Sequence, residues 1–259
     1  MRLVVKVGTS TLAYSTGHLN IRHMESLCKV LSDIKNAGYE VILVSSGAVG
    51  MGMGKLSLRS RPTELSLKQA AAAVGQCELM YTYDKLFSEY NHTVAQLLLT
   101  AEDVKDQERK QNFINTMLKL LELNAIPIIN ENDTVATSEL VIGDNDTLAA
   151  IVAKNTKADL LVLLSDIDGL FTADPHKNPD AKLINRVDKI TDDIVKLAGG
   201  VGSNVGTGGM VTKIKAAQIA TSAGCDMIIA NGKDPAILYE IIEGKEIGTR
   251  FVGENKNDN

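Results

Sequence analysis

Short, continuously apolar segments alternate along this chain with longer segments of helical periodicity. The apolar segments are rich in Val, Ile and Leu, as in strands buried on both faces, and they span residues 2–7, 40–45, 92–99, 125–130, 159–165, 226–231 and 249–252. Helical patterns follow most of them, at about residues 21–37, 66–89, 108–123, 144–155 and 235–242 and from Met210 onward. This alternation predicts an α/β fold with a mainly parallel sheet between two layers of helices.

The first long helix shows this periodicity clearly. Asn20 is its expected N-cap, and Gly38 is the expected residue just after its C-terminus. One apolar face is predicted to contain Ile21, Met24, Leu27, Cys28, Leu31 and Ile34.

Polar residues and glycines gather where the predicted strands end. The segments concerned are "KVGTS", "SSGAVGMGMG", "ENDTVA", "GDND", "DIDGLFTADP" and "GTGGMVTK". Because ligands of open α/β sheets bind beyond the carboxyl ends of the strands, we expect a site at this edge.

Residues 206–217, "GTGGMVTKIKAA", combine a glycine-rich loop with the start of a helix near Met210 and a lysine, Lys213, in its first turn. Backbone N–H groups of such a loop and the positive end of a helix bind phosphate. Lys6 interrupts an otherwise apolar strand and would add a positive charge to this site. A glycine loop at 47–54 lies at the same edge and would add backbone N–H groups. The alternatives are a plain loop with a solvated lysine, and a lysine that snorkels from a sheet edge.

Two familiar phosphate-binding patterns are not matched. "VGMGMGKL" lacks the first glycine and the final Ser or Thr of the P-loop, and "GVGSNV" lacks the last glycine of the dinucleotide fingerprint.

Acidic residues also gather at this edge: Glu131, Asp133, Asp144 and Asp146. Mg²⁺, the lysines or a substrate ammonium group would have to lie between them and a nucleotide. Asp144 or Asp146 is also a candidate helix N-cap, and both roles are compatible.

Composition excludes several other functions. A net charge of −5 argues against binding of nucleic acid, and the chain has no apolar run long enough for a membrane span. The three cysteines, Cys28, Cys77 and Cys225, and the four histidines lack ligand spacing, so no protein metal site is expected. Buried free thiols and the lack of a signal peptide predict a cytoplasmic protein.

The motifs together resemble the amino acid kinase family. The resemblance rests on "VVKVGTS", "LVSSGAV", "AAVGQ", "PIINENDTVA", "GDNDTLAA", "LLSDIDGLFTADP" and "GTGGMVTKIKAAQIATSAG", in order from about residue 2 to residue 252. It implies an open, mostly parallel eight-stranded sheet between helices, a three-layer sandwich. It also implies a single kinase domain over residues 1–259, with an amino-acid lobe to about 155 and a nucleotide lobe from about 156. No C-terminal RNA-binding PUA module, which many relatives carry, is expected.

The activity implied by the resemblance is ATP-dependent phosphorylation of the side-chain carboxylate of L-glutamate, with Mg²⁺ accompanying ATP, as the first step of proline biosynthesis. Lys6, Lys213 and Asp146 match the catalytic positions, and Asp146 orients the two lysines. The glutamate-site positions are matched by Ser46, Gly47, Asn130, Asp133, Asp144 and Asn145. The nucleotide positions are matched by Lys6, Ser165 (usually threonine), Asp166, Thr207, Gly208, Gly209, Met210, Val211, Thr212 and Lys213.

The resemblance further implies feedback inhibition by L-proline and a homo-oligomer. Rival functions are family kinases that act on acetylglutamate, aspartate, carbamate or UMP, and a non-catalytic amino-acid sensor. A UMP acceptor would need more basic residues, and an acetylated amine would not need an aspartate partner. Retention of Lys6, Asp146 and Lys213 argues against a sensor.

Overall fold

The computed structural model describes residues 1–14, 16, 18–136, 144–175, 177–198 and 209–254. Its centre is one eight-stranded sheet with the order β3-β4-β2-β1-β5-β7-β8-β6. The strands are β1 (Arg2–Val7), β2 (Glu40–Ser45), β3 (Val94–Leu99), β4 (Ile126–Glu131), β5 (Leu160–Ser165), β6 (Arg186–Val187), β7 (Asp226–Asn231) and β8 (Thr249–Phe251). Every neighbouring pair is parallel except β7 and β8.

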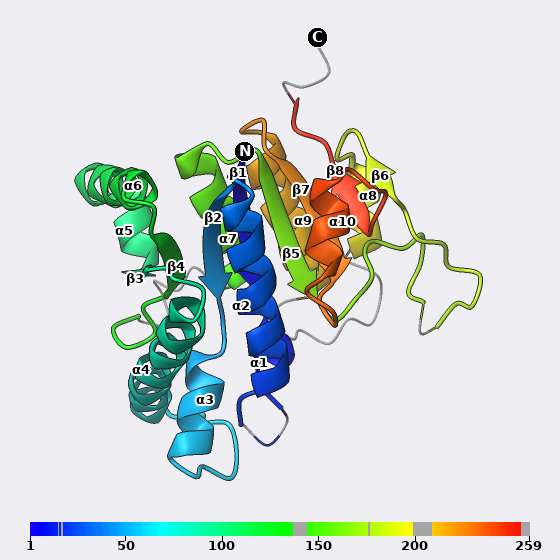
Figure 1. The fold of residues 1–259 in the computed structure, drawn as a ribbon. Coiled ribbons are helices and arrows are strands. Elements are labelled where there is room, and N and C mark those ends of the chain that lie inside the picture. Colours follow the sequence, from blue (N-terminus) through cyan, green and yellow to red (C-terminus); the bar gives the residue numbers. More distant parts are fainter. Residues whose placement is uncertain (15, 17, 137–143, 176, 199–208, 255–259) are drawn as a thin grey trace.

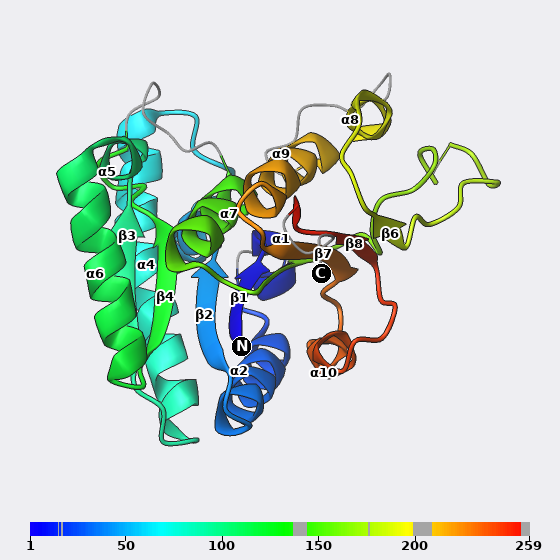
Figure 2. The same ribbon diagram turned by 90° about the horizontal axis from the view of Figure 1, so that it is seen from above.

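Helices cover both faces of this sheet, as the views from the front and from above show (Figures 1 and 2). One layer contains α2 (Ile21–Asn36), α4 (Leu65–Ser88) and α10 (Ile237–Ile242). The opposite layer contains α6 (Gln107–Glu122), α7 (Asn145–Thr156) and α9 (Met210–Thr221). The remaining helices are short: α1 (Thr9–Leu12), α3 (Ala48–Lys55), α5 (Ala101–Lys105) and α8 (Asp192–Ala198).

Two hydrophobic cores fill the spaces between the layers. Val4 and Ile42 face the core under α6, α7 and α9, whereas Leu3, Val5 and Leu43 face the core under α2 and α4. Successive strand residues therefore enter opposite cores, which explains why these strands are apolar throughout. The predicted three-layer sandwich with an eight-stranded, mostly parallel sheet is confirmed.

Most predicted elements lie close to their expected positions, but the short elements α1, α5, α8 and β6 were not predicted. Three other expectations are corrected. Residues 48–55 form helix α3, not the predicted glycine loop. Ile21 is 60% exposed, because it begins α2 ahead of the buried stripe. Cys77 is exposed, whereas Cys28 and Cys225 are buried. The expected capping of α2 is confirmed: the Asn20 side chain accepts from the backbone N–H of His23, and Gly38 has a positive φ of 94°.

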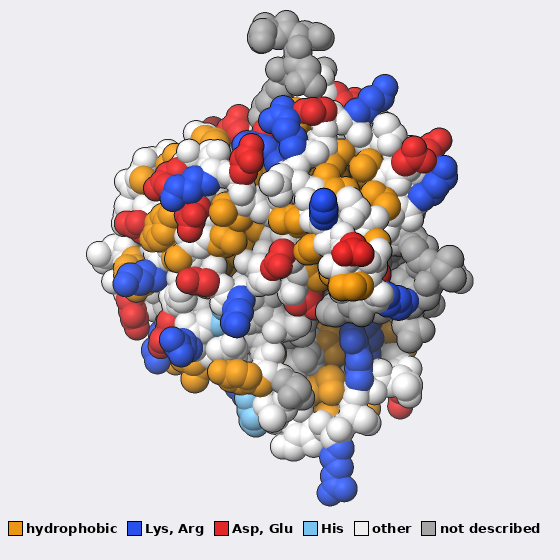
Figure 3. All heavy atoms as spheres, turned by 90° about the vertical axis from the view of Figure 1, so that its right-hand side faces the viewer, with side chains coloured by type: hydrophobic (Ala, Val, Ile, Leu, Met, Phe, Trp, Pro, Cys, Tyr) orange, Lys and Arg blue, Asp and Glu red, His pale blue; other side chains and the backbone are white. Residues whose placement is uncertain are grey.

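Six parallel strands end at one edge of the sheet, at Val7, Ser45, Leu99, Glu131, Ser165 and Asn231. This arrangement confirms that the polar segments after these strands share one edge. Within the described ranges, every helix is too short or too polar to span a bilayer. On the face at the right-hand side of Figure 1, basic and acidic side chains are interspersed (Figure 3).

Candidate active site

Asp146 lies at the centre of the charged cluster at this edge. Its Oδ1 is 2.6 Å from Nζ of Lys6, and its Oδ2 is 3.0 Å from Nζ of Lys213. The Asp146 side chain is 1% exposed, and the two lysine side chains are 10% and 4% exposed. The structure thus brings together a strand end and two helix starts that are separated by up to 207 residues in sequence (213 minus 6).

Opposing effects determine the charge of Asp146. Burial alone would raise the pKa of its carboxyl, but the charges of Lys6 and Lys213 and their hydrogen bonds outweigh burial, and the pKa is lowered. The carboxylate is therefore ionised. A buried ion cluster gives little net stability, because desolvation offsets the attraction, so its geometry is better explained by function.

The N-termini of helices α7 and α9 position Asp146 and Lys213. Asp144 caps α7: its Oδ1 accepts from the backbone N–H of Thr147 at 2.7 Å, and its Oδ2 accepts from the hydroxyl of Thr147 at 2.9 Å. Helix α9 begins at Met210, and Lys213 lies in its first turn. The hydroxyl of Thr212 contacts Asp146 Oδ2 at 3.1 Å and Gly209 O at 2.7 Å. The starts of α7 and α9 are therefore joined through Asp146.

A cluster of amides adjoins this charged group. Nδ2 of Asn145, the first residue of α7, lies 2.7 Å from Ser46 Oγ, 3.0 Å from Asn130 Oδ1 and 3.2 Å from Ser45 O. Ser45 and Asn130 belong to the carboxyl ends of β2 and β4. The predicted glutamate-site residues Ser46, Asn130 and Asn145 therefore lie in direct contact, next to the lysine pair.

Helix α4 contributes two buried side chains to this cluster that the sequence prediction missed. Gln76 Oε1 accepts from Asn130 Nδ2 at 2.9 Å, and the hydroxyl of Tyr83 lies 2.8 Å from Ser45 Oγ. Their spacing of seven residues places them on one helix face. The available signal was a lone glutamine in the alanine-rich run "AAAAVGQ".

Asp133 lies in the turn after β4 and is partly buried. Burial raises the pKa of its carboxyl, and nearby Lys68 and Arg61 oppose that rise without cancelling it. Among the described residues, no side chain forms a hydrogen bond with the Asp133 carboxylate.

Two glycines, Gly8 and Gly47, lie at the same edge. Gly47 has a φ of 105°, a conformation that other residues rarely adopt, and it precedes α3. A Cβ on Gly8 would lie 3.6 Å from Nζ of Lys6, so the lysine amine lies against the backbone of this glycine. Both positions permit a close approach of ligand to backbone N–H groups.

The predicted nucleotide residues are placed in part. Ser165 ends β5, its hydroxyl contacts Asp166 Oδ1 at 3.1 Å, and Asp166 is exposed. Gly209, Met210, Val211, Thr212 and Lys213 form the start of α9, where Val211 is 54% exposed. Thr207 and Gly208 lie outside the described residues.

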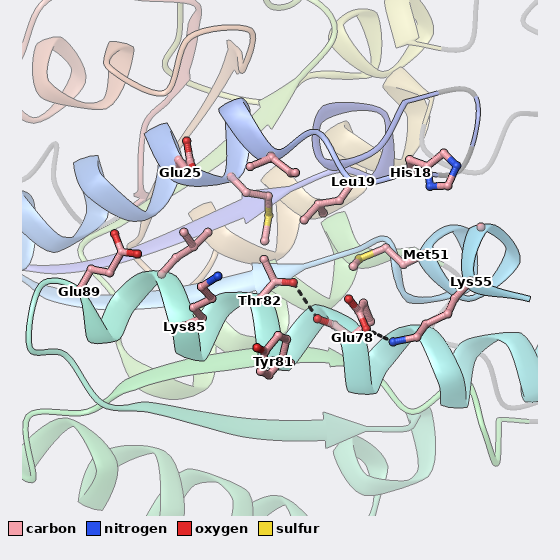
Figure 4. A pocket seen from close by; sticks show the side chains of 14 residues that line it. His18, Leu19, Glu25, Met51, Lys55, Glu78, Tyr81, Thr82, Lys85 and Glu89 are labelled. Carbon is pink, nitrogen blue, oxygen red and sulfur yellow. Dashed lines mark hydrogen bonds and ion pairs between the residues drawn. The ribbon is translucent and has the colours of Figure 1, made fainter.

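Two hollows lie elsewhere on the described surface. A groove of about 550 Å³ opens between α2, α3 and α4, and its lining includes Met24, Met51, Glu78 and Lys85 (Figure 4). A second hollow of about 320 Å³ is lined by the α5–α6 segment and by residues on both sides of Asp133. Neither is lined by Lys6, Asp146 or Lys213. Among the described residues, no three His, Cys, Asp or Glu side chains converge as metal ligands.

Comparison with known proteins finds related sequences over most of the chain. Residues 1–231 match the model of the amino acid kinase family. A glutamate 5-kinase of Clostridium tetani is 57% identical over 96% of this chain and 93% of its own length. A glutamate 5-kinase of Caldanaerobacter subterraneus is 54% identical over 97% of this chain and 68% of its own length.

Solved structures show the same fold at low sequence identity. A carbamate kinase from Giardia lamblia bound to AMP-PNP superposes with a TM-score of 0.68 at 16% identity, over 97% of each chain. An isopentenyl phosphate kinase from T. acidophilum gives a TM-score of 0.65 at 19% identity, over 97% of this chain and 100% of that one.

Proposed function

Because the chain belongs to the amino acid kinase family, we propose as its function the reaction of its curated relatives, the ATP-dependent phosphorylation of L-glutamate to L-glutamyl 5-phosphate. This reaction is the first step of proline biosynthesis from glutamate. A side-chain carboxylate oxygen of glutamate forms a bond to the γ-phosphorus, the bond from that phosphorus to the β–γ bridging oxygen breaks, and ADP leaves with the electron pair. The carboxylate is already a nucleophile, so no general base is needed.

The observation that carries this proposal is the pairing of Lys6 and Lys213 on one buried carboxylate. Transfer between two anions requires positive groups at fixed positions, and Asp146 holds both amines at the sheet edge. A pair of unit charges about 4 Å apart interacts by roughly 1 kcal/mol in water and 4 kcal/mol at an effective dielectric of 20. Contacts of this size that strengthen in the transition state account for several powers of ten in rate.

The acceptor amino acid would bind in the amide cluster beside the lysines. We assign Asp133 to the α-ammonium, the one positive group of glutamate, because its carboxylate is partly buried and lies in the turn after β4. Ser46, Asn130 and Asn145 would contact the substrate, and Gly47 would offer its backbone N–H. Asp144 would act by capping α7 and so positioning Asn145.

The nucleotide would lie on the β5–α9 side of the lysines, against Ser165, Asp166 and residues 207–213. This division makes residues up to about 155 the amino-acid lobe and the remainder the nucleotide lobe. A Mg²⁺ ion would enter with ATP and be held mainly by phosphate oxygens. When bound, Mg²⁺ would offset phosphate charge.

An assay with hydroxylamine tests the reaction directly, since hydroxylamine converts an acyl phosphate into a hydroxamate. The protein is incubated with Mg-ATP, hydroxylamine and one acceptor at a time: glutamate, acetylglutamate or aspartate. Parallel reactions with UMP or carbamate are followed by ADP release. Hydroxamate is expected with glutamate, and a reaction without ATP is the control. Hydroxamate formed only with another acceptor, or ADP released only with UMP or carbamate, would overturn the proposed substrate.

A further inference from the structure

We propose that Gln76 of α4 is a positioning residue for the acceptor amino acid, which acts by holding the amide of Asn130 and, through it, Asn145. The proposal rests on the proposed function. It assigns a role to a residue that does not belong to the predicted site and that lies on a helix outside the segments after the strands.

The buried face of α4 is apolar except for two residues. Among the described residues of this helix, the buried ones are Ala71, Ala72, Gly75, Gln76, Leu79, Tyr83, Leu86 and Phe87. Gln76 is 8% exposed and Tyr83 is fully buried. Each bonds to a residue at a strand end: Gln76 to Asn130 of β4, and Tyr83 to Ser45 of β2. Nδ2 of Asn145 lies between these two strand ends and donates to Ser45 O and to Asn130 Oδ1.

The direction of each hydrogen bond in this cluster follows from backbone groups. The N–H of Glu131 can only donate, and it donates to Asn130 Oδ1 at 2.9 Å. Asn130 must therefore turn its Nδ2 the other way, where the buried amide needs an acceptor, and Gln76 Oε1 supplies it. Ser45 O can only accept, which directs Nδ2 of Asn145 toward it and toward Asn130 Oδ1.

This arrangement leaves a defined group for the substrate. With Nδ2 of Asn145 engaged, its Oδ1 is the remaining polar atom of that side chain, and it accepts no hydrogen bond within the part of the chain that the structure describes. A carbonyl oxygen suits an N–H donor such as the α-ammonium. Gln76 thus helps to present a hydrogen-bond acceptor, the Oδ1 of Asn145, to the amino-acid substrate.

Gly75 explains how α4 comes near enough for this bond. A Cβ at residue 75 would lie 1.7 Å from Ala48 O and 2.4 Å from Gly52 N. Only glycine allows the helix backbones to approach this closely. In the motif "AAVGQ", the glycine therefore allows α4 to approach α3 closely, and the next residue, Gln76, forms the hydrogen bond to Asn130.

The test replaces Gln76 with methionine, which has a similar size but no amide. We expect the KM for glutamate to rise about tenfold or more, because Asn130 Nδ2 loses its buried acceptor and its amide can reorient. The KM for ATP should stay within about twofold, since the proposed nucleotide residues lie on other elements. Gln76→Asn, which is too short to reach Asn130, should give the same selective loss if the methionine variant folds poorly. Gln111→Met, at an exposed position on α6, is the matched control.

A double-mutant cycle separates this role from a purely structural one. In an Asn130→Ala background, Gln76→Met should have little further effect on kcat/KM for glutamate, because the residue that Gln76 holds is absent. Equal losses in both backgrounds, or equal rises in the KM for ATP and for glutamate, would overturn the proposal. An unchanged KM for glutamate in both Gln76 variants would do so as well. Failure of the wild-type protein to phosphorylate glutamate would instead reject the proposed function.

Discussion

At the scale of single residues, the contrast between Asp146 and Asp133 is informative. Both carboxyls are largely removed from water, yet the pKa of Asp146 is lowered and that of Asp133 is raised. The difference arises because Asp146 contacts two lysine amines, whereas Lys68 and Arg61 oppose burial at Asp133 only partly. Asp146 is therefore paired within the protein, whereas for Asp133 we propose a cationic ligand group as the partner.

We expect Lys6→Ala and Lys213→Ala each to lower kcat by at least about two powers of ten, since each removes a positive group that stabilises the transferring phosphoryl group. The fold should survive in both variants, because Asp146 keeps one lysine and the hydroxyl of Thr212 as partners. Steady-state kinetics and circular dichroism measure the two effects. Lys215→Ala, an exposed position on the same helix, is the control. Near-normal turnover of either variant would remove that lysine from the mechanism.

Asp133→Ala should raise the KM for glutamate by about tenfold or more and leave the KM for ATP nearly unchanged, because its proposed partner is the α-ammonium. Only the ionised carboxylate binds an ammonium, and burial raises the pKa of Asp133. The wild-type KM for glutamate should therefore rise as the pH falls through that pKa, at a higher pH than an exposed aspartate would require, and this rise should vanish in Asp133→Ala. A selective change in the KM for ATP would contradict the assignment.

At the scale of elements, the close contact of α3 with α4 places Gln76 and Tyr83 beside the proposed acceptor site. Gly52 and Gly75 face backbone atoms of the opposite helix, and an added Cβ would lie 1.8 Å from Ala71 O or 1.7 Å from Ala48 O. These glycines lie inside helices, where glycine costs about 0.5–1 kcal/mol relative to alanine. The close helix contact offsets that cost and brings Gln76 and Tyr83 to the strand ends.

Gly75→Ala should therefore lower the free energy of unfolding by about 1–3 kcal/mol, because α3 and α4 must move apart. It should also raise the KM for glutamate, since Gln76 moves with α4. Gly50→Ala is the matched control in α3: its Cβ would meet only the methyl group of Thr9, at 3.4 Å, so its stability should be equal or slightly higher. Urea unfolding compares the three proteins. A stability of Gly75→Ala equal to that of the wild type would show that the contact is not tight.

At the scale of the whole molecule, one sheet edge collects groups from both halves of the chain. Lys6 and Asn130 come from β1 and β4, and Lys213 comes from α9 beyond β5. The predicted acceptor residues Ser46, Asn130, Asp133, Asp144 and Asn145 all lie before residue 155 and among the described residues. We therefore expect control by an amino acid to act among these residues. A homo-oligomer remains a separate prediction.

We expect L-proline to inhibit this protein by competition with glutamate. Proline has an α-carboxylate and a positive amine, so Asp133 can serve both ligands, but it has no side-chain carboxylate to accept phosphate. Increasing proline should raise the apparent KM for glutamate and leave the KM for ATP nearly unchanged, and Asp133→Ala should weaken this inhibition. Absence of inhibition at millimolar proline, or inhibition that saturating glutamate does not relieve, would count against a shared site.

The sequence by itself determined the layers and the edge at which the site lies. Continuously apolar strands such as residues 40–45 require burial on both faces, and residues after parallel strands must meet at one edge, so local patterns were sufficient. Family motifs also indicated Lys6, Asp146 and Lys213, which the structure brings into contact. Capping by Asn20 and Asp144 was equally local, because a cap bonds within its own helix turn.

The tertiary structure alone decided what depends on contacts between distant segments. Glycines at 47–54 predicted a loop, but the segment is helical after Gly47 because α4 packs against it, and no local pattern reports such a partner. The short strand β6 was missed, because two residues carry no periodicity and its pairing with β8 defines it. Gln76 has the sequence context of an ordinary helix residue. Its role follows only from the 2.9 Å contact with Asn130, 54 residues away, since a hydrogen bond depends on where two atoms meet in the folded chain.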